Sequence, residues 1–177
     1  MKKIILIGIP NAGKSTLGRR AAEVLNMSFY DIDSIIIENL KLERLAGFTR
    51  IILNGRFIKE QIKIMCDLFK NEKPAIISTS AETALIHECA VLMKNMGTII
   101  HIKRDPEISL AGMREKKCSI VMEINGERVD TQKGVIEEYA KEISAYEALA
   151  DLTLENNGTE DEGLERLLKM LEQTFIN

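Results

Sequence analysis

The chain has 177 residues and a formal net charge of −3, with 27 acidic against 24 basic side chains. This length fits one domain with a single core, and the scattered charges give no basic surface for nucleic acid. The 3 cysteines have no CxxC spacing, which argues against a disulfide framework or a zinc site and favours reduced thiols in a cytoplasmic protein. No apolar run approaches the ~20 residues of a membrane span, so we expect neither a nucleic-acid nor a membrane partner.

An apolar strand and a glycine-rich loop open the chain. The run IILIGI predicts a buried strand over residues 3–9, and GIPNAGKST, residues 8–16, satisfies the pattern GxxxxGK[ST]. In this pattern the loop N–H groups and the following helix N-terminus bind phosphate oxygens. Lys14 reaches the β- and γ-phosphates, and the Ser15 hydroxyl ligates Mg²⁺. The predicted nucleotide-binding residues are Gly8, Asn11, Ala12, Gly13, Lys14, Ser15 and Thr16. We expect Lys14 to be exposed to phosphate and not to belong to the core.

Two carboxylates follow the next predicted strand, residues 28–31. Asp31 and Asp33 lie at its carboxyl end, which is the edge of an open α/β sheet where ligands bind. A carboxylate there can hold Mg²⁺ through water, and a second can orient or deprotonate an acceptor hydroxyl. The alternative is that Asp33 caps a helix, because Ser34 and an apolar run follow it.

Short apolar runs then alternate with longer amphipathic segments. Further strands are predicted over residues 74–78, 98–102 and 151–154, with a long amphipathic helix over 135–149. This alternation is typical of an α/β fold with a parallel sheet, here of five strands.

Two other segments have signatures of their own. Thr159 and Glu162 form a capping box that starts the last helix. The segment 114–130 is charged at its ends and has a turn-like Asn125-Gly126, which predicts a mobile loop or lid.

Many small GTPases have the sequence PNAGKS in this loop, so a GTP-driven switch is one interpretation. Such a switch needs a DxxG sequence, which the chain lacks, and an NKxD sequence that reads guanine. The nearest match, residues 102–105, reads IKRD and has an apolar residue in place of Asn. These mismatches favour a kinase that phosphorylates a small molecule.

Several motifs together resemble the shikimate kinase family. Residues 8–33 contain, in order, a GxGK[ST]-like loop, Gly18 within the helix and a DxD sequence; AYEALADLTLENNG, residues 145–158, is similar to the end of the family. REKKCSIV, residues 114–121, lies where the family has its lid.

This resemblance implies a three-layer P-loop kinase fold over residues 1–177, with a five-stranded parallel sheet flanked by helices. It places an acceptor-binding helical region at about 34–72 and a mobile lid at about 114–130. It also implies ATP as donor, Mg²⁺ as cofactor, a small hydroxyl-bearing acceptor, Asp31 near the metal and Asp33 at the acceptor hydroxyl. We further expect Arg114 to contact the nucleotide and the protein to be a monomer or weak homodimer.

The acceptor side departs from the family pattern. Ile58 follows Phe57 where the family has a substrate arginine, and Glu142 stands four residues before Tyr146 where it has another. The remaining departures are Thr79-Ser80-Ala81 in place of three glycines, and Cys118, with Lys116 and Lys117 beside it, in place of a lid arginine.

These departures predict an acceptor site that is not built for a carboxylate. The expected acceptor is a neutral or cationic hydroxyl compound, with Lys14 and Asp33 as catalytic residues. The predicted acceptor-binding residues are Asp33, Phe57, Lys59, Ser80 and Glu142. The alternatives are a genuine shikimate kinase with a rebuilt carboxylate site, and a nucleotide-binding regulator resembling a GTPase.

Overall fold

Five parallel strands form the central sheet of the computed structural model, which describes residues 3–41, 55–115, 122–124, 127–129, 140–141 and 143–175. The strand order is β2-β3-β1-β4-β7. The strands are β1 (Lys3–Ile7), β2 (Ser28–Asp31), β3 (Ala75–Ser78), β4 (Gly97–Lys103) and β7 (Leu152–Glu155). All five predicted strands are therefore present, and the α/β fold is confirmed.

The central strand β1 explains why the chain begins with an unbroken apolar run. Ile5 pairs with Ile77 of β3 on one side and with Ile99 of β4 on the other. Ile4 and Ile5 are fully buried, because helices cover both faces of the sheet. A parallel strand buried on both faces has no solvent side, so its sequence does not alternate.

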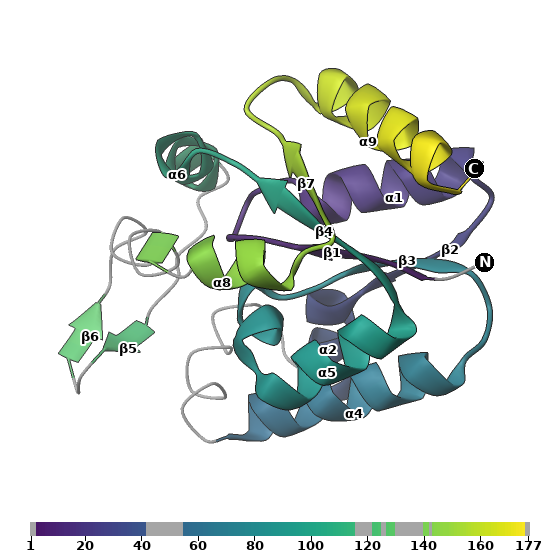
Figure 1. The fold of residues 1–177 in the computed structure, drawn as a ribbon. Helices are drawn as coiled ribbons and strands as arrows, with labels where there is room; N and C mark the ends of the chain where they lie inside the picture. The colour runs from purple at the N-terminus through teal and green to yellow at the C-terminus, as the bar shows by residue number, and fades with distance from the viewer. Residues whose placement is uncertain are drawn as a thin grey trace.

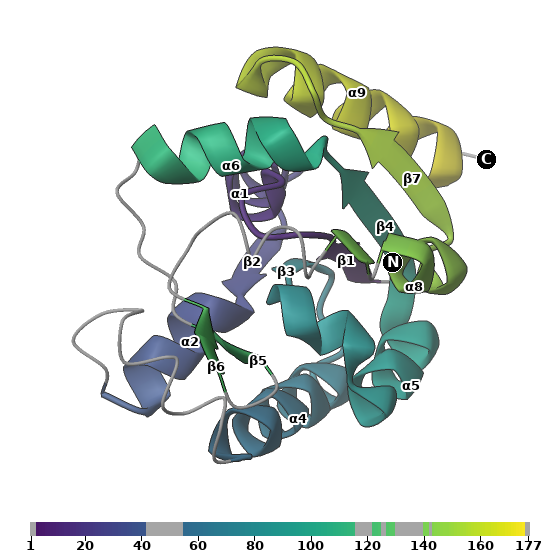
Figure 2. The ribbon, with the colours of Figure 1, turned by 90° about the vertical axis from the view of Figure 1, so that its left-hand side faces the viewer.

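Helices form the outer two layers (Figures 1 and 2). One face of the sheet carries α1 (Lys14–Val24) and α9 (Glu160–Phe175), which pack on each other. The opposite face carries α2 (Ile32–Asn39), α4 (Arg56–Lys70), the 3₁₀ helix η2 (Ala81–Leu85), α5 (His87–Met96) and α8 (Ile143–Leu149). Helix α6 (Pro106–Glu115) lies beside the carboxyl ends of the strands in Figure 1. Among the described residues, no helix is long and apolar enough to cross a membrane.

The last helix begins where its capping box predicts. The backbone N–H of Thr159 donates to Glu162 Oε2 at 2.8 Å, and the N–H of Glu162 donates to Thr159 Oγ1 at 3.3 Å. The apolar stripe of α9 then buries Leu167 and Leu171 against the core. The predicted cap is therefore confirmed.

The predicted lid contains regular structure. Strands β5 (Met122–Ile124) and β6 (Glu127–Val129) pair antiparallel as a separate small sheet, which sequence analysis expected only as a loop. Residues 116–121, 125–126 and 130 of that segment lie outside the described residues, as do 135–139 and 142 of the predicted long helix.

Candidate active site

The phosphate-binding loop connects β1 to α1 at the carboxyl edge of the sheet. The backbone has positive φ at Gly8 (140°), Asn11 (55°) and Gly13 (100°), and α1 starts directly afterwards at Lys14. A Cβ atom on Gly13 would stand 2.5 Å from Asn156 Nδ2, so both the conformation and the space require glycine there. The loop and the helix N-terminus thus have the backbone arrangement that the predicted anion site requires.

The side chain of Lys14 is turned onto the loop itself. Its Nζ donates to the carbonyl oxygens of Gly8 at 2.8 Å and Ile9 at 2.9 Å, and only 8% of the residue is exposed. Burial lowers the pKa of the Lys14 ammonium, and nearby carboxylates, including Asp33 and Glu82, oppose this shift. The expectation that Lys14 is exposed was therefore wrong, because the loop carbonyls satisfy a desolvated ammonium. To bind a phosphate, the ammonium must exchange these carbonyls for phosphate oxygens.

The two residues predicted to hold the metal lie near the ends of β2 and β3. Ser15 Oγ is 3.1 Å from Ser78 Oγ, and Asp31 pairs with Ser78 in the β2–β3 register. Asp31 also caps α2, since its Oδ1 accepts the N–H of Ser34 at 3.0 Å. The helix cap that we considered for Asp33 is therefore supplied by Asp31.

Asp33 lies in the first turn of α2, where Ser80 of the next strand end reaches it. Ser80 Oγ donates a hydrogen bond to Asp33 Oδ1, and Ser80 is buried. Burial raises the pKa of the Asp33 carboxyl, while Ser80 and Lys14 act in the opposite direction. A carboxylate held in this way, close to the phosphate-binding lysine, is suited to accept a proton from a hydroxyl group.

Sequence analysis missed Glu82 as a third acidic group of this site. Burial, followed by the charge of Asp33, raises the pKa of Glu82 to about 7. Its segment is fixed by two neighbours, because Tyr146 Oη donates to the Ala81 carbonyl at 3.2 Å and Thr83 Oγ1 donates to Gln61 Oε1. The available signal was an acidic residue just after a strand end at the ligand-binding edge of the sheet.

Asn156 is a second residue that sequence analysis missed. It follows β7 and is buried, and its Nδ2 donates to the Ala12 carbonyl at 2.7 Å. Asn156 thus holds the loop from the β7 edge of the sheet, whereas Asp33 follows β2 at the opposite edge.

The described residues among the other predicted site residues differ in their burial. Phe57 belongs to the hydrophobic core, whereas Ile58 is 41% exposed and Lys59 is exposed on α4. Thr16 is partly buried in the first turn of α1. Arg114 lies in α6, but its side chain is outside the description, and Glu142, Cys118, Lys116 and Lys117 fall outside the described residues.

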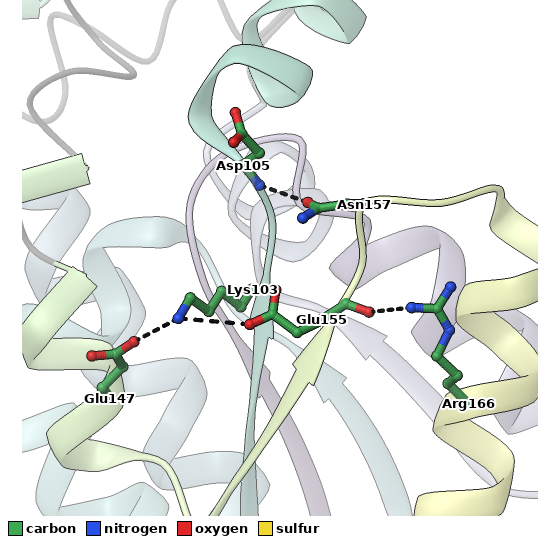
Figure 3. A network of polar contacts seen from close by, with 6 residues as sticks. All are labelled: Lys103, Asp105, Glu147, Glu155, Asn157 and Arg166. Carbon is green, nitrogen blue, oxygen red and sulfur yellow. Dashed lines mark hydrogen bonds and ion pairs between the residues drawn. The ribbon is translucent and has the colours of Figure 1, made fainter.

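The residues resembling a guanine-reading motif have other partners (Figure 3). Lys103 Nζ forms ion pairs with Glu147 at 3.1 Å and with Glu155 at 3.6 Å, which joins β4 to α8 and β7. Asp105 Oδ1 accepts the N–H of Glu107 at 2.8 Å at the start of α6. Both side chains thus have structural contacts, which weakens the GTPase interpretation.

Comparisons with known proteins agree with the resemblance seen in the sequence. A family model described as shikimate kinase matches residues 10–172. Curated shikimate kinases from Buchnera aphidicola and Clostridium botulinum are 27% and 29% identical, over 88% and 83% of this chain and 87% and 84% of theirs. A shikimate kinase from Azobacteroides pseudotrichonymphae is 31% identical over 67% of this chain and 69% of its own length.

Solved structures share the fold. The shikimate kinase from Aquifex aeolicus is 26% identical, with a TM-score of 0.73 and coverage of 97% of both chains. The shikimate kinase from Acinetobacter baumannii, solved in complex with shikimate, has a TM-score of 0.83 over 100% of this chain and 94% of its own. Its identity of 18% supports the fold alone. The match over residues 10–172, together with the phosphate-binding loop and the DxD sequence, shows that this chain belongs to the shikimate kinase family of small-molecule kinases that use ATP.

Proposed function

We propose that this chain transfers the γ-phosphate of ATP to a hydroxyl group of a neutral or cationic small molecule. The observation that carries the proposal is the charge of the acceptor side. The carboxylates of Asp33 and Glu82 both lie within electrostatic reach of Lys14 and of each other. Because the pKa of Glu82 is about 7, this second carboxylate is largely ionised in mildly alkaline solution.

The proposed chemistry uses the residues at the strand ends. The loop amides and Lys14 bind the phosphates of ATP, and Asp33 accepts the proton of the acceptor hydroxyl as that oxygen attacks the γ-phosphorus. The bond between the γ-phosphorus and the β–γ bridging oxygen breaks at the same time, and ADP leaves. The hydrogen bond from Ser80 orients the Asp33 carboxylate. The same burial that raises the pKa of Asp33 makes it a better base than an exposed aspartate.

The proposal includes Mg²⁺. Ser15 is exposed beside the loop, and Asp31 stands at the end of β2 with one oxygen committed to the helix cap. A hydroxyl and a carboxylate are the oxygen ligands that Mg²⁺ takes beside phosphate oxygens. When bound, the ion would neutralise charge on the transferred phosphate; Ser15 and Asp31 would hold it.

The acceptor class follows from charge. In the proposed alignment, Ile58 replaces one arginine that would pin a substrate carboxylate, and it is exposed on α4. Each lost charge-assisted contact costs about 1.5 to 3 kcal/mol. The absence of both family arginines should therefore weaken the binding of a substrate carboxylate by about two to four powers of ten. Glu82 adds repulsion to an anion, whereas a hydroxyl or an ammonium group can donate to it.

An acceptor panel tests this proposal. ADP release is measured with ATP and Mg²⁺ on polyols, amino sugars and amino cyclitols, and on shikimate and other hydroxy acids. We expect activity with a neutral or cationic compound and poor activity with the acids. The Glu82→Gln variant should reduce the difference in activity between the neutral or cationic compounds and the acids. The control Glu72→Gln changes an exposed glutamate just before β3, at the edge of the sheet opposite to Asp33, and should leave that difference unchanged.

Shikimate itself is the second candidate acceptor, because the similar curated proteins are named shikimate kinases. Efficient, saturable phosphorylation of shikimate by the wild-type chain would overturn the neutral or cationic acceptor. It would show that other residues have rebuilt the carboxylate site.

A further inference from the structure

The phosphate-binding loop and helix α6 are joined by two reciprocal side-chain contacts. Asn11 Nδ2 donates to the Ser109 carbonyl at 3.0 Å, and Ser109 Oγ donates to the Pro10 carbonyl. Ser109 is fully buried, whereas Pro10 and Asn11 are half-buried, so both contacts are partly shielded from water. Residues 98 positions apart in the chain thus hold the loop against α6.

The backbone at Asn11 is suited to this contact. Its φ of 55° lies in the left-handed region, which asparagine tolerates better than most residues other than glycine. Glycine would adopt the conformation at lower cost but would supply no amide to α6. The Pro10-Asn11 sequence, which we associated with GTPases, therefore has a structural role here, because both residues bind Ser109 of α6.

Gly112 provides the space that the Asn11 amide occupies. It lies one turn after Ser109 on the same face of α6, and a Cβ atom there would stand 2.4 Å from Asn11 Nδ2. The amide could rotate away from such an atom, but only by giving up its hydrogen bond to Ser109. Asn11 and Gly112 are thus a matched pair, in which the small residue permits the contact made by the large one.

We propose that Asn11 is a positioning residue for ATP, which fixes the phosphate-binding loop against α6 through its fit to Gly112. The backbone N–H groups of the loop must point toward phosphate oxygens, and a loop already held in that shape loses less freedom on binding. One net hydrogen bond corresponds to about a two- to tenfold change in an equilibrium constant. We expect ATP affinity to change by that factor when the contact is lost.

A double-variant cycle tests the proposal by calorimetric titration of ATP with Mg²⁺ into wild type, Asn11→Gly, Gly112→Ala and the double variant. Each single change should weaken ATP binding about two- to tenfold. The double variant should bind no more weakly than Asn11→Gly alone, because the added methyl group then meets no amide. Independent effects would instead multiply.

Two further variants separate positioning from general stability. Asn26→Gly is the matched control, since Asn26 has φ 51° and is exposed after α1; it should leave ATP affinity unchanged. Ser109→Ala removes the reciprocal contact without a large volume change, and it should weaken ATP binding in the same direction as Asn11→Gly. The proposal is overturned if Asn11→Gly and Ser109→Ala bind ATP as wild type does, if they lower only the melting temperature, or if the two changes in the cycle multiply.

Discussion

Acid should destabilise this protein through His101 on β4. The side chain is 1% exposed, its ring lies 5.5 Å from that of Tyr146, and its Nδ1 has no hydrogen-bond partner among the described residues. Burial lowers the pKa of His101 from 6.5 to about 4, although the charge of Glu147 acts in the opposite direction. The folded protein therefore holds this imidazole neutral where the unfolded chain already binds a proton.

The sign and the size of the effect follow from these two values. Above pH 6.5 His101 is neutral in both the folded and the unfolded state, so it does not change the free energy of unfolding. Below pH 6.5 the unfolded chain binds a proton at His101, whereas the folded protein does not bind it until about pH 4. Each pH unit in this window costs about 1.4 kcal/mol. The free energy of unfolding should fall by about 2 kcal/mol by pH 5, and by about 3 kcal/mol in full.

Urea unfolding of wild type and His101→Phe, at several values between about pH 7.5 and pH 5, measures this contribution. Carboxylates titrate equally in both proteins, so only the difference between them matters. Relative to the variant, the wild type should lose about 2 kcal/mol across this range. His87→Gln, at an exposed histidine, is the control and should track the wild type. A constant difference between wild type and His101→Phe would refute the buried neutral imidazole.

Three further changes have defined outcomes. Lys14→Ala should weaken ATP binding by about one to two powers of ten, as expected for lost bonds to a charged group; calorimetry showing equal affinity would contradict the phosphate-loop assignment. Asp33→Asn should abolish phosphate transfer but retain ATP binding, and loss of ATP binding in the same titration would contradict its role at the acceptor. Gly18→Ala places a Cβ atom 2.8 Å from Phe29 and 2.9 Å from Leu6, so urea unfolding should show a loss of about 1 to 3 kcal/mol; an unchanged or raised stability would show that the helix can shift.

Local sequence patterns predicted the elements well because their causes are local. The buried run of β1, the loop after it and the capping box at Thr159 each depend on residues within a few positions of one another. The predicted strand 28–31 coincides with β2, and the other four strands agree to within two residues at either end. The paired strands β5 and β6 were missed, although Asn125-Gly126 between them is a common hairpin signal.

Side-chain roles at the site were harder to predict because they depend on contacts between distant elements. The spacing of Asp31 and Asp33 indicated two functional carboxylates, but not which of them caps α2. Lys14 was expected to point outward, since the sequence does not show that the loop carbonyls can satisfy its ammonium. The role of Glu82 could not be predicted, because Glu82 and Asp33 are far apart in the chain and interact electrostatically only in the folded structure.

The contact between Asn156 and Ala12 spans 144 positions of the chain, almost its whole described length. During synthesis the phosphate-binding loop is made early, whereas Asn156, which follows β7 and contacts the loop, is made near the end. A chain that has formed only its early strands therefore contains the phosphate-binding loop but lacks the contact from Asn156 that supports it. Because ATP favours the state to which it binds, the nucleotide should stabilise the completed fold over earlier intermediates. ATP affinity should therefore depend on whether β7 has joined the sheet.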